Sequence, residues 1–130
     1  MKSVPRYRVL VVEDEAITAL ALEQTLSAHG FDVCGLTSTA AEARSVAERA
    51  RPAVAIIDVR LKDGVIGHVV ARDLQARLGI PVILMSGHAD ARTARELGAA
   101  GFLPKPFSDR DLVRAIEKAL GVGAVAPLES

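Results

Sequence analysis

The stretch "AIIDVRLKDG" (residues 55–64) runs an apolar segment directly into one carboxylate, Asp58. A continuous apolar run of this kind is typical of a strand that is buried on both faces of a parallel sheet. An ionised carboxylate is costly to remove from water unless a neighbour compensates its charge. Asp58 therefore either lies in a wet loop or is held at the end of a buried strand to do chemistry.

Short apolar runs alternate with longer amphipathic stretches on both sides of this segment. Strands are predicted over residues 7–12, 32–36, 53–58, 81–86 and 101–104. Helices are predicted over residues 14–30, 39–50, 67–79, 89–99 and 108–121. Strands that alternate with helices predict an α/β domain, in which helices cover both faces of a parallel sheet.

Three helix starts carry capping signals. Asp14 can cap the first predicted helix. Thr39 with Glu42, and Ser108 with Asp111, have the spacing of a capping box, in which a side chain and a backbone amide satisfy each other reciprocally. These signals support the predicted helix boundaries.

The composition limits the class of protein. The chain has 130 residues, of which 50% are hydrophobic, so it suits a single domain with a packed core. Lys plus Arg and Asp plus Glu both number 16, and the formal net charge is +0. A protein that binds nucleic acid through bulk charge would be strongly basic, so we expect no direct nucleic-acid partner.

The sequence also bears on redox state and location. The single cysteine, Cys34, excludes an intramolecular disulfide and is typical of a small buried hydrophobe. No apolar run approaches the roughly 18 residues of a membrane span, and the N-terminal "MKSVPRYR" (1–8) lacks the apolar core of a signal peptide. We therefore expect a cytoplasmic protein without a membrane partner.

Polar side chains follow four of the predicted strands. They are Glu13 and Asp14 after the first, Asp58 at the end of the third, Ser86 at the end of the fourth and Lys105 after the fifth. Parallel strands end at the same edge of a sheet, which is where ligands bind in open α/β folds. We therefore expect three acids, one hydroxyl and one lysine to meet there.

These residue types point to phosphoryl chemistry. Carboxylates that lie together repel, and Mg²⁺, a hard cation that prefers oxygen ligands and phosphate oxygens, relieves that repulsion. One of the carboxylates can then attack a phosphoryl group and form an aspartyl phosphate. Lys105 and Ser86 can neutralise and hydrogen-bond the new phosphoryl oxygens. Asp58 is the expected acceptor because its strand is central in such sheets.

Four pieces of the sequence, in this order, resemble the receiver domain of two-component response regulators: "VLVVEDE" (9–15), "AIIDVRL" (55–61), "VILMSG" (82–87) and "FLPKPF" (102–107). Each piece alone is a weak signal, and four in register are a strong one. The resemblance spans about residues 7 to 120. It implies a doubly wound (βα)5 flavodoxin-like parallel sheet, with a receiver domain over residues 1–121 and a tail or truncated linker over 122–130.

The resemblance implies a metal site and an acceptor. Asp58 would be the phospho-acceptor and would take part in binding Mg²⁺. Asp14 would bind Mg²⁺ directly and Glu13 would bind it through water. The backbone carbonyl of Arg60 would be a further metal ligand.

The resemblance also implies a switch. Ser86 and Lys105 would contact the phosphoryl group, Phe102 would be the aromatic residue that rotates, and the Lys105–Pro106 bond would be cis, which only an X–Pro bond adopts readily. The phosphoryl donor would be a histidine kinase or a histidine phosphotransfer protein. A downstream protein or a second copy of the chain would bind the face formed by the fourth helix, fifth strand and fifth helix (89–121).

The loop after the acceptor departs from the usual pattern of the family. Lys62 stands where receivers often have proline, and Gly67 lies nine residues after Asp58 rather than eight. "DGVIG" (63–67) is similar to a variant loop of some receivers. The Arg60 side chain would flank the phosphoryl group.

Other interpretations stay open. Taken alone, Glu13 and Asp14 can simply cap a helix, and Phe102 can be an ordinary core residue. A degenerate receiver would be an interaction module that does not respond to phosphate. A Mg²⁺-dependent phosphohydrolase would use the same acids, but it would need a second Asp two residues after Asp58, where this chain has Arg60. We therefore expect a signalling switch and no enzyme beyond its own phosphorylation and dephosphorylation.

Overall fold

The computed structural model describes residues 6–61, 67–87 and 91–122. The strands are β1 (Arg8–Val12), β2 (Asp32–Thr37), β3 (Val54–Asp58), β4 (Val82–Ser86) and β5 (Gly101–Pro104). The helices are α1 (Ala16–Ala28), α2 (Ala40–Ala50), α3 (Gly67–Leu78), α4 (Ala91–Leu97) and α5 (Asp109–Leu120). The predicted elements are confirmed in type and order. No helix in the described ranges combines the length and the apolar character that crossing a membrane requires.

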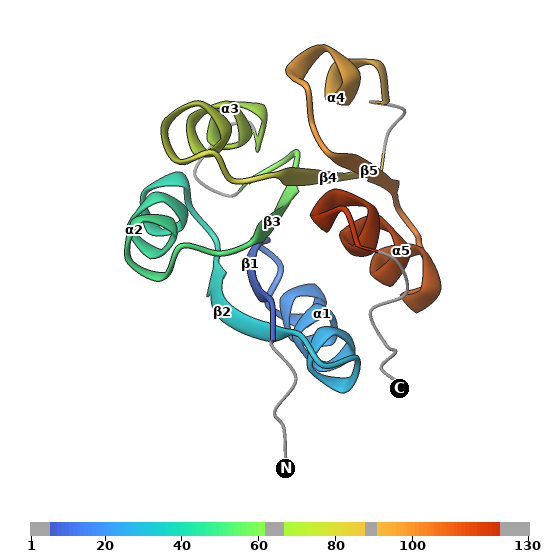
Figure 1. Cartoon of the computed structure of the whole chain (residues 1–130). Helices are drawn as coiled ribbons and strands as arrows, with labels where there is room; N and C mark the ends of the chain where they lie inside the picture. Colours follow the sequence, from blue (N-terminus) through green and yellow to red (C-terminus); the bar gives the residue numbers. More distant parts are fainter. Residues whose placement is uncertain (1–5, 62–66, 88–90, 123–130) are drawn as a thin grey trace.

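The five strands form one parallel sheet in the order β2-β1-β3-β4-β5 (Figure 1). The chain winds from β1 out to β2, then returns past β1 to β3 and continues to β5. This order confirms the predicted doubly wound, flavodoxin-like sheet, whose direction of winding reverses between β1 and β3. β3 is therefore central, with β1 on one side and β4 on the other.

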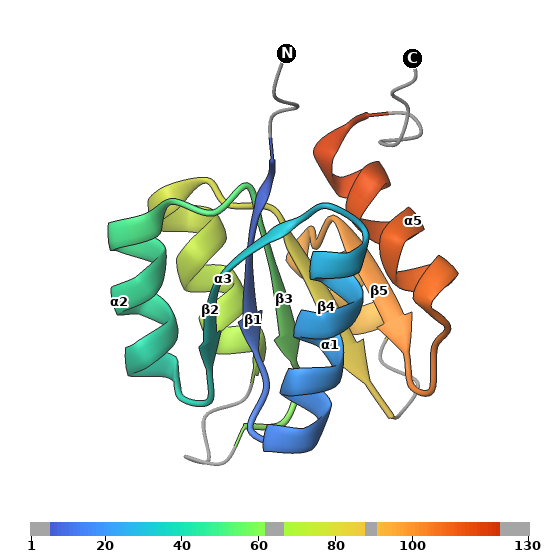
Figure 2. The ribbon, with the colours of Figure 1, turned by 90° about the horizontal axis from the view of Figure 1, so that it is seen from below.

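Helices cover both faces of the sheet and bury a separate core on each (Figures 1 and 2). One core lies under α1 and α5 and includes Leu22, Leu26, Leu112 and Ile116. The other lies under α2, α3 and α4 and is built largely from small or branched residues such as Ala47. β3 and β4 are buried along their whole length, which explains why their sequences are continuously apolar.

The first helix begins later than predicted, and Asp14 is not its cap. The N-cap residue is Glu15, whose side chain makes no capping hydrogen bond. The Glu15 amide instead donates to Glu13 Oε2 at 3.2 Å. The prediction was wrong because Asp14 faces the acidic cluster at the end of the sheet, where its carboxylate lies near two others.

The two predicted capping boxes have different outcomes. Ser108 and Asp111 form the complete box at the start of α5. At α2, Thr39 accepts the Glu42 amide at 3.2 Å, but the Glu42 carboxylate accepts the amide of Ser38. The second box therefore forms only in half.

Some predictions fall on residues that the structure leaves undescribed. Lys62 and most of "DGVIG" lie outside the described residues, as do the first two residues of the predicted helix 89–99. The predicted tail is described only at Val122.

Candidate functional site

The carboxyl edge of the sheet carries a pocket of about 320 Å³. It lies where β1, β3, β4 and β5 end, which is the edge that the strand pattern predicts. Its lining residues are Asp14, Glu15, Asp58, Arg60, Ser86, Gly87 and Lys105.

Backbone hydrogen bonds between neighbouring strands hold these residues at one level. Beyond β3, the Val59 amide donates to the Met85 carbonyl at 3.0 Å. The Lys105 amide donates to the Ser86 carbonyl at 2.7 Å, and the Glu13 amide donates to the Thr37 carbonyl at 2.8 Å. The sheet ladder thus continues one residue past the strands and fixes the positions from which the side chains project.

Three carboxylates gather at this edge. Glu13, Asp14 and Asp58 each offer an oxygen atom, and these atoms all lie within 4.8 Å of one another. Glu13 is 2% exposed and Asp58 is 7% exposed. Two of the three acids are therefore buried, and each needs a partner to remain ionised.

Lys105 is the partner of both buried acids. Its Nζ donates to Asp58 Oδ2 at 2.8 Å and to Glu13 Oε1 at 3.2 Å. The other Asp58 oxygen, Oδ1, accepts the Arg60 amide at 3.0 Å. One ammonium group therefore bonds to acids that follow two different strands, and the Asp58 carboxylate is oriented through both of its oxygens.

The surroundings shift two pKa values. Burial and the neighbouring Asp58 carboxylate raise the pKa of Glu13 from 4.5 to about 7. Burial alone would lower the pKa of Lys105, but its hydrogen bond to Asp58 and the charge of Glu13 outweigh that effect and raise it. The raised pKa keeps Lys105 charged. The negative charge of the clustered acids is larger than this one ammonium group can neutralise.

The donor set suits a hard divalent cation. With all groups ionised, three carboxylates and one ammonium leave two negative charges uncompensated. Mg²⁺ takes carboxylate and carbonyl oxygens and keeps several waters, which the open pocket can admit. Receiver domains bind Mg²⁺ at such an acidic pocket, and the residues present here fit that ion.

The structure places the two predicted switch residues differently. Ser86 is 3% exposed and lines the pocket beside Asp58. Phe102 is half-buried, packs against the core on the α2–α4 side and lies outside this pocket. The predicted cis bond between Lys105 and Pro106 is confirmed.

The sequence analysis missed several features of this edge. Glu15 and Gly87 line the pocket. Both end a quoted motif piece, "VLVVEDE" and "VILMSG", but neither was expected at the site. The Arg60 amide that holds Asp58 is two residues from it, as in an Asx turn. An aspartate after a strand is a known signal for that turn, so this hydrogen bond was predictable.

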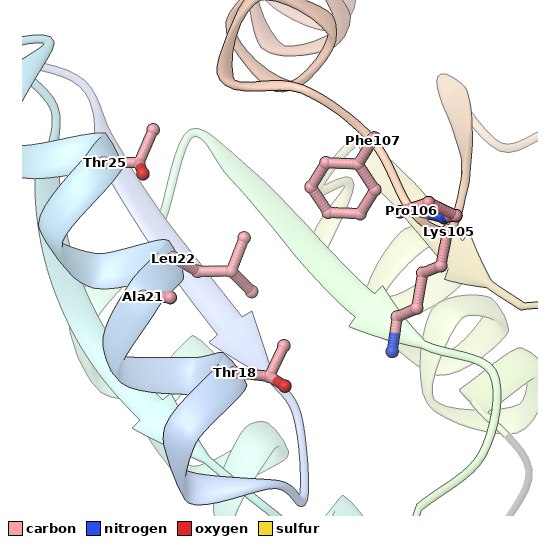
Figure 3. Close-up of a pocket in the computed structure, with 7 residues that line it drawn as sticks. All are labelled: Thr18, Ala21, Leu22, Thr25, Lys105, Pro106 and Phe107. Atoms are coloured by element: carbon pink, nitrogen blue, oxygen red, sulfur yellow. The ribbon is translucent and has the colours of Figure 1, made fainter.

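A second hollow adjoins the pocket and was also missed. It is an apolar groove of about 420 Å³ between α1 and the segment after β5, lined by Thr18, Ala21, Leu22, Thr25, Lys105, Pro106 and Phe107. Figure 3 shows the side chains of Thr18, Leu22 and Thr25 directed across it toward Phe107 and Lys105. On the outer surface of α1, Ile17 is 84% exposed and Leu20 is 52% exposed.

Comparison with known proteins identifies the family. Residues 9–117 match the family described as response regulator receiver domain. The chain is 33% identical over 123 residues to the transcriptional regulatory protein PdtaR of Mycobacterium tuberculosis, covering 91% of this chain and 58% of that protein. It is 32% identical over 114 residues to the phyllosphere-induced regulator PhyR of Methylorubrum extorquens, covering 86% and 43%. The chain thus spans about half the length of these curated relatives.

A solved structure agrees with the sequence relatives. The signal receiver domain of a modulated diguanylate cyclase from Desulfovibrio desulfuricans superimposes with a TM-score of 0.82 at 32% identity, over 90% of this chain and 95% of that one. Receiver domains are signalling switches rather than conventional enzymes. Fold, acidic edge and family match agree: the chain belongs to the response regulator receiver domains of two-component systems.

Proposed function

We propose that this domain accepts a phosphoryl group on Asp58 in a Mg²⁺-dependent reaction and transmits that event as a change of shape. The observation that carries the proposal is the position of the Asp58 carboxylate. It ends the central buried strand, bonds to Lys105 and lies among the oxygens of Glu13 and Asp14. Nothing about the packing of β3 requires a carboxylate there, whereas phosphoryl transfer does.

The site residues have distinct roles in this proposal. Asp14, Asp58, Glu13 through water, and the Arg60 carbonyl would hold Mg²⁺, which supplies charge neutralisation for the phosphoryl oxygens. An Asp58 oxygen forms the new O–P bond as the donor's N–P bond breaks, and the electron pair leaves with the donor's imidazole nitrogen. Lys105 moves its hydrogen bond from the carboxylate to a phosphoryl oxygen.

The output follows from Ser86 and Phe102. The Ser86 hydroxyl turns toward the phosphoryl group, and Phe102 turns inward, so that the face of α4, β5 and α5 changes between two states. A groove of about 410 Å³ on this face is lined partly by Phe102, Arg114 and Lys118. Its lining is largely apolar, with Arg114, Lys118 and Asp111 as its charged members, which supports the binding of a downstream protein or a second copy of the chain.

The phosphoryl donor is a histidine kinase or a histidine phosphotransfer protein that docks against α1. A protein donor must cover the pocket, and the adjoining groove begins at Lys105 and is otherwise mostly apolar. Ile17 and Leu20 are large apolar side chains exposed on the same helix. Such ATP-dependent kinases act in the cytoplasm, so the proposal includes a cytoplasmic location, with the receiver domain over residues 1–121 and a tail or linker after it.

Intact-mass spectrometry tests the acceptor. The wild-type chain is incubated with acetyl phosphate and Mg²⁺, alongside Asp58→Asn and a sample with metal removed. One phosphoryl adduct is expected in the wild type and none in either control. An adduct on Asp58→Asn would show that another residue is the acceptor.

Absence of any adduct has two explanations that one further measurement separates. Beryllofluoride mimics the phosphoryl group without being hydrolysed. Its binding in the presence of Mg²⁺ would indicate an acceptor whose phosphate is lost too quickly to trap. A chain that binds neither beryllofluoride nor Mg²⁺ would be a degenerate interaction module. Steady turnover of a small phosphate ester would instead identify a phosphohydrolase.

Surface variants test the donor surface. Ile17→Glu and Leu20→Glu should slow transfer from a phosphorylated histidine phosphotransfer protein and leave acetyl phosphate labelling unchanged. Val69→Glu is the matched control, because Val69 is 58% exposed on α3, away from the groove. Equal transfer rates in all three variants would exclude α1 as the docking surface.

A further inference from the structure

Gly67, the first residue of α3, lies against the backbone of the acceptor segment. Its amide donates to the Val59 carbonyl with an N···O distance of 2.6 Å. A Cβ atom placed on Gly67 would overlap the Asp58 carbonyl oxygen and lie 2.9 Å from both the Asp58 carbonyl carbon and Val59 Cα. Real Cβ atoms essentially never approach other atoms within 3.0 Å, so only a hydrogen atom fits there.

The reason for glycine here is space and not backbone conformation. Four other described glycines, Gly30, Gly79, Gly98 and Gly121, have positive φ angles, and a Cβ on any of them would meet nothing within 4 Å. Gly67 differs in both respects: its φ is not positive, and a Cβ placed on it would overlap backbone atoms of Asp58 and Val59. Backbone atoms cannot rotate away as a flexible side chain can, so any larger residue must displace α3 or residues 58–59.

We propose that Gly67 is a positioning residue for phosphoryl transfer: by letting α3 abut the backbone of Asp58 and Val59, it sets the direction of the Asp58 carboxylate and of the Arg60 backbone. This proposal rests on the function proposed above. Asp58 Oδ1 accepts the Arg60 amide at 3.0 Å, so a displacement of residues 58–59 changes both the acceptor and the carbonyl expected to bind Mg²⁺. The glycine acts through these groups and does not touch the reacting atoms.

The first test is Gly67→Ala. A displacement of several tenths of an ångström is enough to spoil metal and acceptor geometry, and a misplacement of about 1 Å can cost roughly 100-fold in rate. We expect the Mg²⁺ dissociation constant, measured from amide shifts in NMR titration, to rise about tenfold, and phosphorylation by acetyl phosphate to slow by about 10- to 100-fold. In the metal-free protein, the amide shifts of Asp58 and Arg60 should already move.

Gly35→Ala is the matched control. A Cβ on Gly35 would meet Val46 Cγ1 at 2.9 Å and Leu10 Cδ1 at 3.3 Å, so it strains the packing of β2 against α2, away from the pocket. It should lower the melting temperature and leave the Mg²⁺ dissociation constant unchanged. A merely structural role for Gly67 would give the same pattern in Gly67→Ala, and that result would overturn the proposal.

Wild-type hydrogen exchange provides a second test that does not depend on the variant folding. Coupling between two sites is reciprocal, so Mg²⁺ binding should increase the protection of the Gly67 amide. The Gly79 amide, which donates to the Gln75 carbonyl at the other end of α3, should be unchanged. Equal protection of Gly67 with and without Mg²⁺ would contradict the proposal. Failure of the wild type to bind Mg²⁺ would instead count against the proposed function.

Discussion

Lys105 Nζ lies 2.8 Å from Asp58 Oδ2, although the two residues are 47 positions apart in the chain. The same ammonium reaches Glu13 Oε1 at 3.2 Å, 92 positions away. Three strand ends therefore meet at one cation. Removing the cation that is paired with a buried acid is strongly destabilising, so this lysine supports the fold as well as the proposed chemistry.

Lys105→Met should destabilise the metal-free protein most at alkaline pH. At pH 8 Glu13 is mostly ionised, and loss of the hydrogen-bond donor that it shares with Asp58 should cost on the order of 1–3 kcal/mol in the free energy of unfolding. Near pH 5 Glu13 is protonated, since its pKa is about 7, and the cost should shrink. Urea unfolding at both pH values measures the difference. Lys118→Met on exposed α5 is the control, and equal losses in the two variants would refute the prediction.

Glu13 should make the metal-free protein less stable as the pH rises. Its pKa is 4.5 when unfolded and about 7 when folded, so the folded state binds the extra proton between these values. Stability relative to Glu13→Gln should therefore fall from pH 4.5 to 7 and then level off. The full shift corresponds to a change of roughly 3 kcal/mol in that difference between low pH and pH 8.

The control for this pH dependence is Glu96→Gln. Glu96 is exposed on α4 and pairs with Arg92 at 3.2 Å. Its difference from the wild type should vary little over the same range. Thermal melts every half pH unit provide the comparison, and a Glu13→Gln difference that stays flat would mean that Glu13 titrates normally.

Mg²⁺ should stabilise the wild type and not Asp14→Asn. A ligand that binds only the folded state at 100 times its dissociation constant adds about 2.7 kcal/mol. Loss of one of the three clustered carboxylates should largely remove that effect, because Asp14 is the carboxylate proposed to bind the ion directly. Asp32→Asn, at the opposite end of β2, should respond like the wild type. Melting temperatures with Mg²⁺ and with a chelator measure the effect, and equal stabilisation of Asp14→Asn would exclude Asp14 from the site.

Ser108→Ala should lower stability by about 1 kcal/mol, because it removes the side-chain half of the complete capping box at α5. Mg²⁺ affinity should be unaffected, since Ser108 is absent from the residues that line the pocket. Chemical denaturation and an NMR titration of the same sample measure both quantities. A change in Mg²⁺ affinity would show that α5 is coupled to the site.

Much of the fold was predictable because the signals are local. Near-continuous apolar runs marked the strands, and β5 has the predicted bounds of residues 101–104. The start of α1 was mispredicted at Asp14, because an acid before a helix can serve either the helix or a cluster formed with distant residues. Sequence spacing cannot distinguish these uses.

For the candidate site, the sequence predicted which residues lie at the ends of the strands, but not the contacts between their side chains. Parallel strands place Asp58, Ser86 and Lys105 at one edge, and no knowledge of strand order is needed to expect that. The groove beside α1 was not predictable, because it depends on how α1 and the segment after β5 pack. The exclusion of a side chain at Gly67 is also a tertiary effect.

The sequence by itself determined which residues end the strands and therefore which chemistry meets at the edge of the sheet. Only the tertiary structure decided that Lys105 bonds to both Asp58 and Glu13 and that burial raises the pKa of Glu13. The physical reason is range: hydrophobic periodicity and caps act over a few residues, whereas desolvation and ion pairing depend on distances that only the packed chain sets.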